Sequence, residues 1–141
     1  MAMRLSVEPY PVVWSDRQKL ISLEWAGRAG HPSSYGLLAG FADPTPGLRV
    51  DSTGARFKEA LCGQADQARW GLPVEYQSAV EDTLAAQPFA IVVSGAAHGE
   101  IGSSPHVFRV LAAMLAHLVA IDLAATNEEL WSLWDRWWNL A

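Results

Sequence analysis

The spacing of hydrophobic positions changes along the chain and predicts strands in the first half and helices in the second. Residues 20–26 alternate, with Trp25 and its aliphatic neighbours on one face, which is typical of a half-buried strand. Residues 35–41 predict another strand, in which Gly36 and Gly40 indicate a bulge or a close backbone approach. These two strands are the clearest sheet signals in the sequence.

Weaker strand signals lie on either side of them. Residues 3–14 predict a first strand, which Pro9 and Pro11 confine to a sheet edge or interrupt. Residues 48–50 and 56–61 are further strand candidates. The N-terminal half is therefore expected to supply most of one sheet.

Loops are predicted between these strands from composition. Residues 27–34 (GRAGHPSS) and 95–104 (GAAHGEIGSS) are rich in the small and polar residues that interrupt regular structure. Residues 43–47 (DPTPG) predict a turn whose geometry proline fixes. Residues 63–69 are expected to form a polar connection.

Helical spacing begins near Pro73, because proline suits the first position of a helix. The helix is expected to end where Gln87 precedes Pro88. Its apolar face consists of side chains spaced by four residues: Tyr76, Val80 and Leu84.

A short apolar run, residues 89–94, predicts a buried strand, and two more helices are expected after it. Ser104 and Pro105 predict an N-cap and a first helical residue. Thr126 and Glu129 form a capping-box pattern that opens the last helix. The apolar stripe of the first of these helices contains Val107, Leu111, Met114, Leu115, Leu118, Ile121 and Leu123.

The order of elements predicts an α+β fold in one domain. Strands come first, then helix, strand, helix and helix, which favours a two-layer sandwich with a mixed β-sheet and helices on one face. The length of 141 residues and a hydrophobic content of 50% fit one domain with its own core. We expect residues 1–125 to form that domain and residues 126–141 to form an amphipathic helix packed on it or on a partner.

Composition points to a cytoplasmic protein without a membrane segment. Cys62 is the single cysteine, which fits a reducing compartment, and its apolar neighbours indicate a small buried side chain. No apolar run reaches the ~18 residues of a membrane span, and the N-terminus lacks the apolar core of a signal peptide. A cytoplasmic location is therefore expected.

The charge is unevenly distributed. The first 70 residues carry eight Lys or Arg and seven Asp or Glu, whereas the remainder carries two and eight. Phosphate contacts supply most of the affinity of nucleic-acid binders. This balance argues against strong RNA binding by the chain alone.

Several short motifs occur in a recognisable order. The first loop reads Gly27-Arg28-Ala29-Gly30 and leads to Tyr35-Gly36. The second loop reads Gly95-Ala96-Ala97-His98 and leads to Ser103-Ser104. Between the two loops the sequence contains Leu72-Pro73 and Glu75-Tyr76. Over residues 20–120 their joint order and spacing resemble the fourth domain of translation elongation factor G. That resemblance implies the fold of the second domain of ribosomal protein S5.

The resemblance also implies a role, that of a non-catalytic binding module. The elongation factor's domain inserts its tip into the ribosome, so the implied partner is ribosomal RNA or a ribosome-associated protein. Arg28 would meet phosphate or carboxylate, Tyr35 would offer a stacking ring and His98 a hydrogen bond. The implied binding loops also contain His31, Glu100 and Ser103. No phosphate-binding loop of a GTPase occurs, so no GTP is expected.

Enzymatic alternatives have weaker support. His31, His98 and Glu100 would make an acid–base or metal site if their loops met, but they match no metal motif. S5-like folds include kinases and nucleases, and residues 99–104 faintly resemble a phosphate loop without an accompanying lysine. We therefore expect no catalytic residue, no metal and no cofactor, and hold a small enzyme as the remaining alternative.

The last helix is rich in tryptophan, which the resemblance does not explain. Its aromatic residues are Trp131, Trp134, Trp137 and Trp138. They are expected either to pack on the sheet and the other helices or to form a partner or homodimer interface. Binding to a membrane surface is disfavoured because the polar positions of the helix are mostly acidic.

Overall fold

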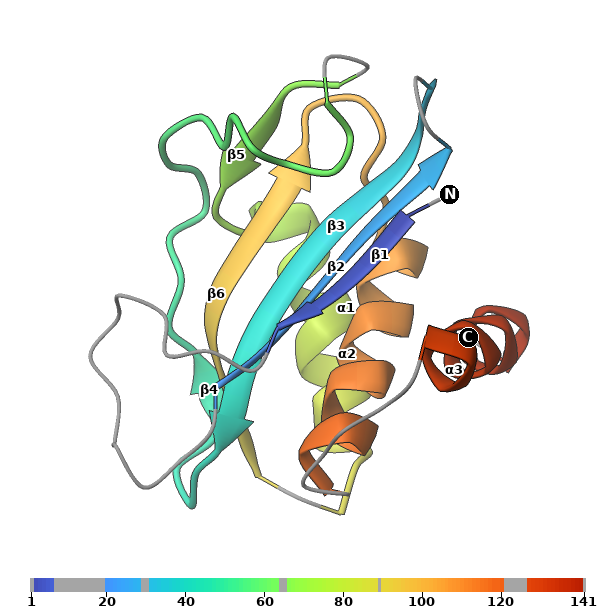
Figure 1. Ribbon diagram of the computed structural model, residues 1–141. Helices are drawn as coiled ribbons and strands as arrows, with labels where there is room; N and C mark the ends of the chain where they lie inside the picture. Colours follow the sequence, from blue (N-terminus) through green and yellow to red (C-terminus); the bar gives the residue numbers. More distant parts are fainter. Residues whose placement is uncertain are drawn as a thin grey trace.

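The computed structural model describes residues 2–6, 20–28, 31–63, 66–88, 90–120 and 127–140. Figure 1 shows these residues as one sheet backed by helices. The strands are β1 (Ala2–Ser6), β2 (Ile21–Arg28), β3 (His31–Ala42), β4 (Gly47–Leu48), β5 (Ala68–Trp70) and β6 (Ile91–Gly99); the helices are α1 (Val74–Ala85), α2 (Pro105–Ala120) and α3 (Asn127–Leu140).

The sheet is mixed and open, as the α+β prediction requires. Its order is β1-β2-β3-β6-β4, and β5 also pairs with β6. Pairs of neighbouring strands are antiparallel except β4 and β6, which run parallel. Strand β6 is therefore central, with β3 on one edge and both β4 and β5 along the other.

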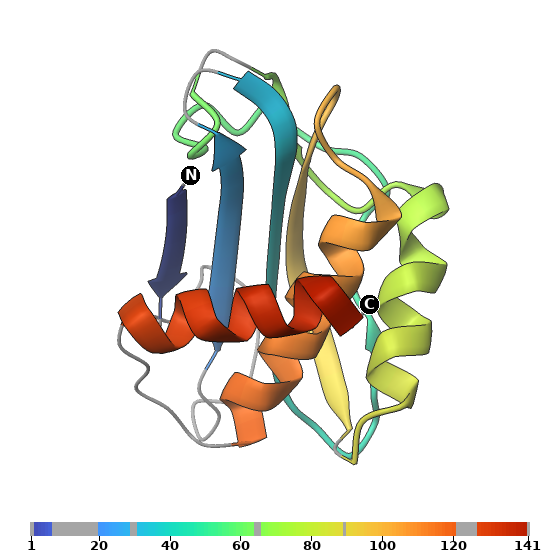
Figure 2. The ribbon, with the colours of Figure 1, turned by 90° about the vertical axis from the view of Figure 1, so that its right-hand side faces the viewer.

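The helices lie on one face of the sheet, with α1 and α2 side by side and α3 crossing over α2 and β2 (Figure 2). A buried cluster fills the space between these layers. Its largest members with almost no exposed surface include Leu23, Leu38, Leu72, Phe108, Leu111, Met114, Leu115 and Leu118. The stripe predicted over 107–118 thus faces the sheet, while Ile121 and Leu123 lie outside the described residues.

The opposite face of the sheet is also buried. Segment 55–63 passes over it and brings Ala60 and Cys62 against β-strand side chains. The strand residues of this second cluster include Ala26, Tyr35, Leu37, Ala39, Phe41, Val92 and Ala97. The predicted arrangement of helices on one face is present, and the other face carries a second, smaller core.

The predicted starts of α1 and α2 are confirmed to within one residue. Pro73, predicted as the first helical residue, is the N-cap of α1, and Tyr76, Val80 and Leu84 pack against the main core. At α2, the Val107 N–H donates to Ser104 Oγ at 3.3 Å, so Ser104 is an N-cap. The pattern for the last helix involves Thr126, which lies outside the described residues.

The expectation for the two strand glycines is also confirmed. A Cβ at Gly36 would lie 2.8 Å from the Leu111 side chain, so this position allows α2 to approach the sheet closely. Gly40 adjoins a register shift between β3 and β6, and a Cβ there would lie 2.4 Å from the Val92 carbonyl oxygen. Close packing explains both glycines.

The two predicted loops are much shorter than expected. Strand β2 continues to Arg28, which pairs with His31 of β3, so residues 27–34 mostly form a hairpin rather than a loop. Strand β6 continues through His98 to Gly99. Composition identified residues that tolerate irregular backbone, but pairing with neighbouring strands satisfied their backbone groups and extended the ladder.

The weaker strand signals are only partly right. Strand β1 covers residues 2–6, and the rest of the predicted 3–14 strand lies outside the described residues. The 48–50 signal corresponds to the two-residue β4, and segment 56–61 is mostly turn with one bridge between Arg56 and Arg69. The predicted connection 63–69 instead runs into β5, which has too few residues to show a period.

The described helices contain no segment that is both long and apolar enough to cross a membrane.

Candidate functional site at the sheet tip

The β2–β3 hairpin and the turn between β6 and α2 lie at the same end of the sheet, at the top of Figure 1. We call this end, formed by residues 28, 31–35, 66–70 and 98–104, the tip. The Tyr35 N–H donates to the Gly102 carbonyl at 3.1 Å, and Ser103 Oγ donates to the Tyr35 carbonyl at 2.7 Å. Two hydrogen bonds therefore connect the turn to β3.

Asp66 holds the other side of this turn. Its carboxylate is buried, with 5% of the residue exposed. Oδ1 accepts from the Ile101 N–H at 3.0 Å and Oδ2 from the Gly102 N–H at 2.8 Å. The Gln67 N–H also donates to Oδ1, at 2.7 Å. Three backbone donors thus stabilise the carboxylate where it sits.

Gly99 and Ser103 complete the turn. The Gly99 N–H donates to Ser103 Oγ at 2.8 Å. A Cβ at Gly99 would lie 2.1 Å from Asp66 Oδ2, so a larger residue would displace the carboxylate. Tyr76 of α1 adds a hydrogen bond from its hydroxyl to the Ser103 carbonyl, at 3.1 Å. Ser103, predicted as a binding residue, uses its hydroxyl inside the turn.

His98 is a buried strand residue rather than the exposed loop histidine expected. It pairs with Gly36 in the ladder, and only 7% of its surface is exposed. Its Nδ1 lies 2.9 Å from the Gly71 carbonyl oxygen, and because a carbonyl only accepts, Nδ1 carries the proton. Gly71 has φ +114°, a conformation that favours glycine, and this fixes the direction of its carbonyl.

Tyr35, predicted as a stacking ring, is fully buried on the other face of the sheet. Its hydroxyl donates to Glu24 Oε2 at 2.7 Å, and the Leu61 N–H donates to the same oxygen at 2.8 Å. The buried Glu24 carboxylate therefore ties segment 55–63 to the sheet. The Tyr35 ring is part of the smaller core and is not exposed for stacking with a ligand.

The exposed features of the tip include one residue predicted for binding, Glu100, and one that was not singled out, Ile101. Glu100 forms an ion pair with Arg69 at 2.5 Å, with both side chains more than one third exposed. Next to it, 69% of Ile101 is exposed at the apex of the turn. Arg28 lies at the end of the neighbouring hairpin. The tip thus presents an apolar apex beside a neutralised charge pair.

The three residues considered for an acid–base or metal site do not share a position in the ladder. His31 pairs with Arg28, whereas His98 pairs with Gly36, five residues further along β3. Because a strand rises ~3.3 Å per residue, the backbone of His98 lies ~16 Å along the sheet from that of His31. Within the described ranges, no three acidic, histidine or cysteine side chains gather as a metal site would require.

The four tryptophans of α3 differ in burial and in the residues that they contact. Trp134 is buried and stacks on Trp25 of β2, with ring centroids 3.7 Å apart. Trp131 meets the same ring edge-on at 5.4 Å. Trp138 is 38% exposed and contacts His106, whereas Trp137 is partly buried against the main core. Trp138 is thus the most exposed of the four residues predicted for an interface.

Sequence reasoning missed two residues that shape the tip. The sequence could have indicated that Ile101 is exposed, because an aliphatic residue between Glu100 and Gly102 in a loop has no apolar neighbours with which to form a core face. No sequence pattern could have indicated the role of Asp66, since it binds backbone groups 35 and 36 residues away. Only the fold brings them together.

Comparisons with protein-family models, with curated proteins and with solved structures find no match to this chain. A function for the chain therefore depends on its own geometry and on the motifs described above.

Proposed function

We propose that this chain is a non-catalytic binding module that contacts a partner protein through the tip. The observation that carries the proposal is the exposed side chain of Ile101 at the apex of the turn. Hydrogen bonds connect this turn to Asp66 on one side and to β3 on the other. A partner that covers the Ile101 side chain would remove its apolar surface from water, which contributes about 1.5–3 kcal/mol to binding when burial is complete.

The turn is preorganised for such a contact. Asp66 accepts from the two backbone N–H groups at the apex, and Ser103 joins the base of the turn to both Gly99 and β3. A loop fixed before binding loses little conformational entropy when a partner engages it. Binding residues on loops held by a rigid scaffold are a common arrangement in proteins.

The resemblance to elongation factor G domain IV supports a ribosome-associated protein as the partner. It implies that both loops meet at one end of an α+β sheet, and the hairpin and turn do lie together (Figure 1). A protein partner is favoured over RNA because the apex is apolar and Arg69 is neutralised by Glu100. The net charge of −5 also opposes phosphate binding.

Ribosome co-sedimentation at low salt tests the proposal. The chain should migrate with ribosomes carrying their associated proteins, and Ile101→Asp should reduce the bound fraction at least fivefold. Ala85→Asp is the matched control, because it adds the same charge to an exposed position at the end of α1. No co-migration, or equal loss in both variants, would contradict the ribosomal role of the tip.

A homodimer through α3 is a second candidate, favoured by the exposed ring of Trp138. Size-exclusion chromatography with light scattering separates this candidate from the first. A dimer that dissociates on Trp138→Ala but persists in Ile101→Asp would assign self-association to α3. A monomer at 100 µM or so would leave the tip as the binding surface.

A further inference from the structure

A hollow of about 630 Å³ lies along the outer edge of β6, between the short strands β4 and β5. Strand β4 pairs with Val92 and Val93, and β5 pairs with residues 97–99, so the hollow opens beside the three residues between them. Its size falls within the ~300–1,000 Å³ of small-molecule sites. The hollow adjoins the tip, because Trp70 belongs to both and Gly71, whose carbonyl accepts from His98, also lines it.

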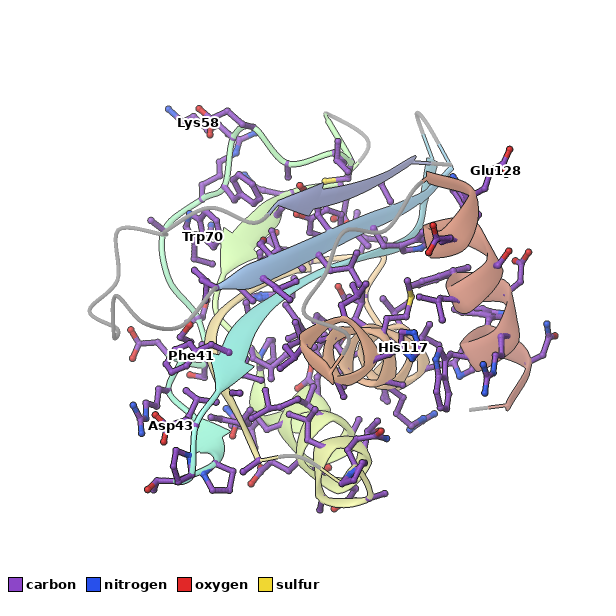
Figure 3. The ribbon with its side chains drawn as sticks, turned by 60° about the horizontal axis from the view of Figure 1, so that its bottom comes forward. Phe41, Asp43, Lys58, Trp70, His117 and Glu128 are labelled. Atoms are coloured by element: carbon purple, nitrogen blue, oxygen red, sulfur yellow. The ribbon has the colours of Figure 1, made fainter. Side chains whose placement is uncertain are left out.

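One wall of the hollow is aromatic. Phe57 and Trp70 stack with ring centroids 4.2 Å apart and an angle of 21° between their planes. Figure 3 shows Trp70 at the end of β5, with Lys58 further out on segment 55–63. Both rings are only partly buried, and both line the hollow. A planar ring is therefore the shape that this wall would hold best.

The floor of the hollow contains a bulge in β6. Gly95 pairs with Ala39 and Val93 pairs with Gly40, so Ser94 is an extra residue without a partner in the ladder. Ser94 Oγ is buried, and it has no hydrogen-bond partner among the residues that the structure describes. Bulges often redirect a side chain next to a binding site. A buried hydroxyl without a partner is costly, and a polar ligand atom here would lower that cost.

Opposite charges stand at the rim. Arg49 and Asp51 both line the hollow, and both are exposed. Their backbones are fixed, because the Arg49 N–H donates to the Val93 carbonyl at 2.8 Å and the Asp51 carbonyl accepts from the Leu72 N–H at 2.8 Å. A guanidinium binds a carboxylate and a carboxylate binds an ammonium group. The rim therefore suits a ligand that carries both charges.

We propose that this hollow binds a small aromatic amino acid. The ring would lie against Phe57 and Trp70, the carboxylate would pair with Arg49, and the ammonium group with Asp51. The Ser94 side chain would rotate about χ1, so that Oγ, which is covered in the ligand-free chain, hydrogen-bonds to the polar end of the ligand. The proposed site adjoins the tip at Trp70 but does not include Ile101, and it does not depend on the function proposed above.

Calorimetric titration of the full chain with L-phenylalanine tests this site. Saturable binding is expected, with 3-phenylpropanoate and 2-phenylethylamine each binding at least tenfold more weakly because each lacks one charge. Arg49→Gln and Ser94→Ala should each weaken L-phenylalanine binding about tenfold. Arg136→Gln and Ser78→Ala are the matched controls, at exposed positions on α3 and α1, and should change nothing.

Three results would overturn the proposal. They are no saturable binding, equal binding of all three compounds, and binding that Arg49→Gln and Ser94→Ala leave unchanged. Heteronuclear NMR spectra of each variant confirm that it is folded, so that a loss of affinity is assigned to the site. Ile101→Asp should bind L-phenylalanine normally, which keeps this test distinct from the test of the tip.

Discussion

Asp66 shows how one buried side chain can determine the shape of a surface. Its two oxygens accept three backbone hydrogen bonds, two of them from the apex of the tip turn. Because those donors point inward, the Ile101 side chain is held outward, where 69% of its surface is exposed. The residue that creates the candidate binding surface is therefore not part of that surface.

Asp66→Ala tests this dependence. Hydrogen bonds to a charged group contribute about 1.5–3 kcal/mol each when they are well formed, and solvent replaces part of that loss, so the free energy of unfolding should fall by about 2–4 kcal/mol. Urea denaturation measures the change. Asp43→Ala is the control, since the Asp43 carboxylate accepts from the Thr45 N–H in an exposed turn and from no other described residue, and it should cost less than about 1 kcal/mol. Equal costs would contradict a special role for Asp66.

Cys62 should react slowly with thiol reagents. Burial raises the pKa of its thiol to about 11, and the nearby Asp66 carboxylate adds to the rise. The thiolate is the reactive form, so at pH 8 labelling of the native chain should be at least ~100-fold slower than labelling of the urea-unfolded chain. Comparable rates would mean that segment 55–63 does not cover the thiol.

The same thiol predicts a pH dependence of stability. The folded state prefers the protonated thiol, so its contribution is complete below the unfolded pKa of about 9 and is lost as pH rises through about 11. The unfolding free energy of the native sequence should therefore fall more steeply between pH 9 and 11 than that of Cys62→Ala. Parallel curves for the two proteins would contradict the raised pKa.

At the scale of elements, α3 packs on α2 and also stacks one aromatic ring on β2. Trp134 lies on Trp25 of β2, and Trp131 adds an edge contact to the same ring. The alternation of residues 20–26 predicted that Trp25 faces inward. It could not predict which of four tryptophans meets it, because the angle at which α3 crosses β2 decides that.

Trp134→Ala should destabilise the chain by about 3–5 kcal/mol, as expected for a large aromatic side chain removed from a core. Trp138→Ala should cost only about 1 kcal/mol, because its ring is partly exposed. Chemical denaturation followed by far-ultraviolet circular dichroism measures both. In a double-mutant cycle, Trp25→Ala and Trp134→Ala should show a coupling of about 0.5–1.5 kcal/mol; additive losses would exclude a direct stack.

At the scale of the whole molecule, the sheet and α3 should differ in local stability. Strands β2, β3 and β6 form the centre of the sheet and carry much of the main core, whereas α3 crosses over α2 and contributes one of the described buried residues, Trp134 (Figure 2). In native-state hydrogen exchange, the amides of α3 should exchange before those of β3 and β6. Exchange of both at one rate would show that α3 unfolds only with the entire molecule.

The sequence predicts much of this architecture, and the parts it misses have physical reasons. Proline, Ser104 and the spacing of apolar residues identified α1 and α2, because these signals act locally. The strand ends at Arg28 and Gly99 were missed because pairing across the sheet overrides loop-like composition. The burial of Tyr35 and His98 depends on Glu24 and Gly71, which are distant in the sequence.

The bulge at Ser94 gives the chain one interior position where its length can change. Val93 and Ala96 contact the helices, whereas Val92 and Ala97 contact the smaller core. Taking out Ser94 would restore strict alternation from Ile91 to Gly99 and leave each of these side chains on its present side. A chain one residue shorter is therefore compatible with the same fold, and it would differ chiefly in the twist of β6 and in the missing hydroxyl.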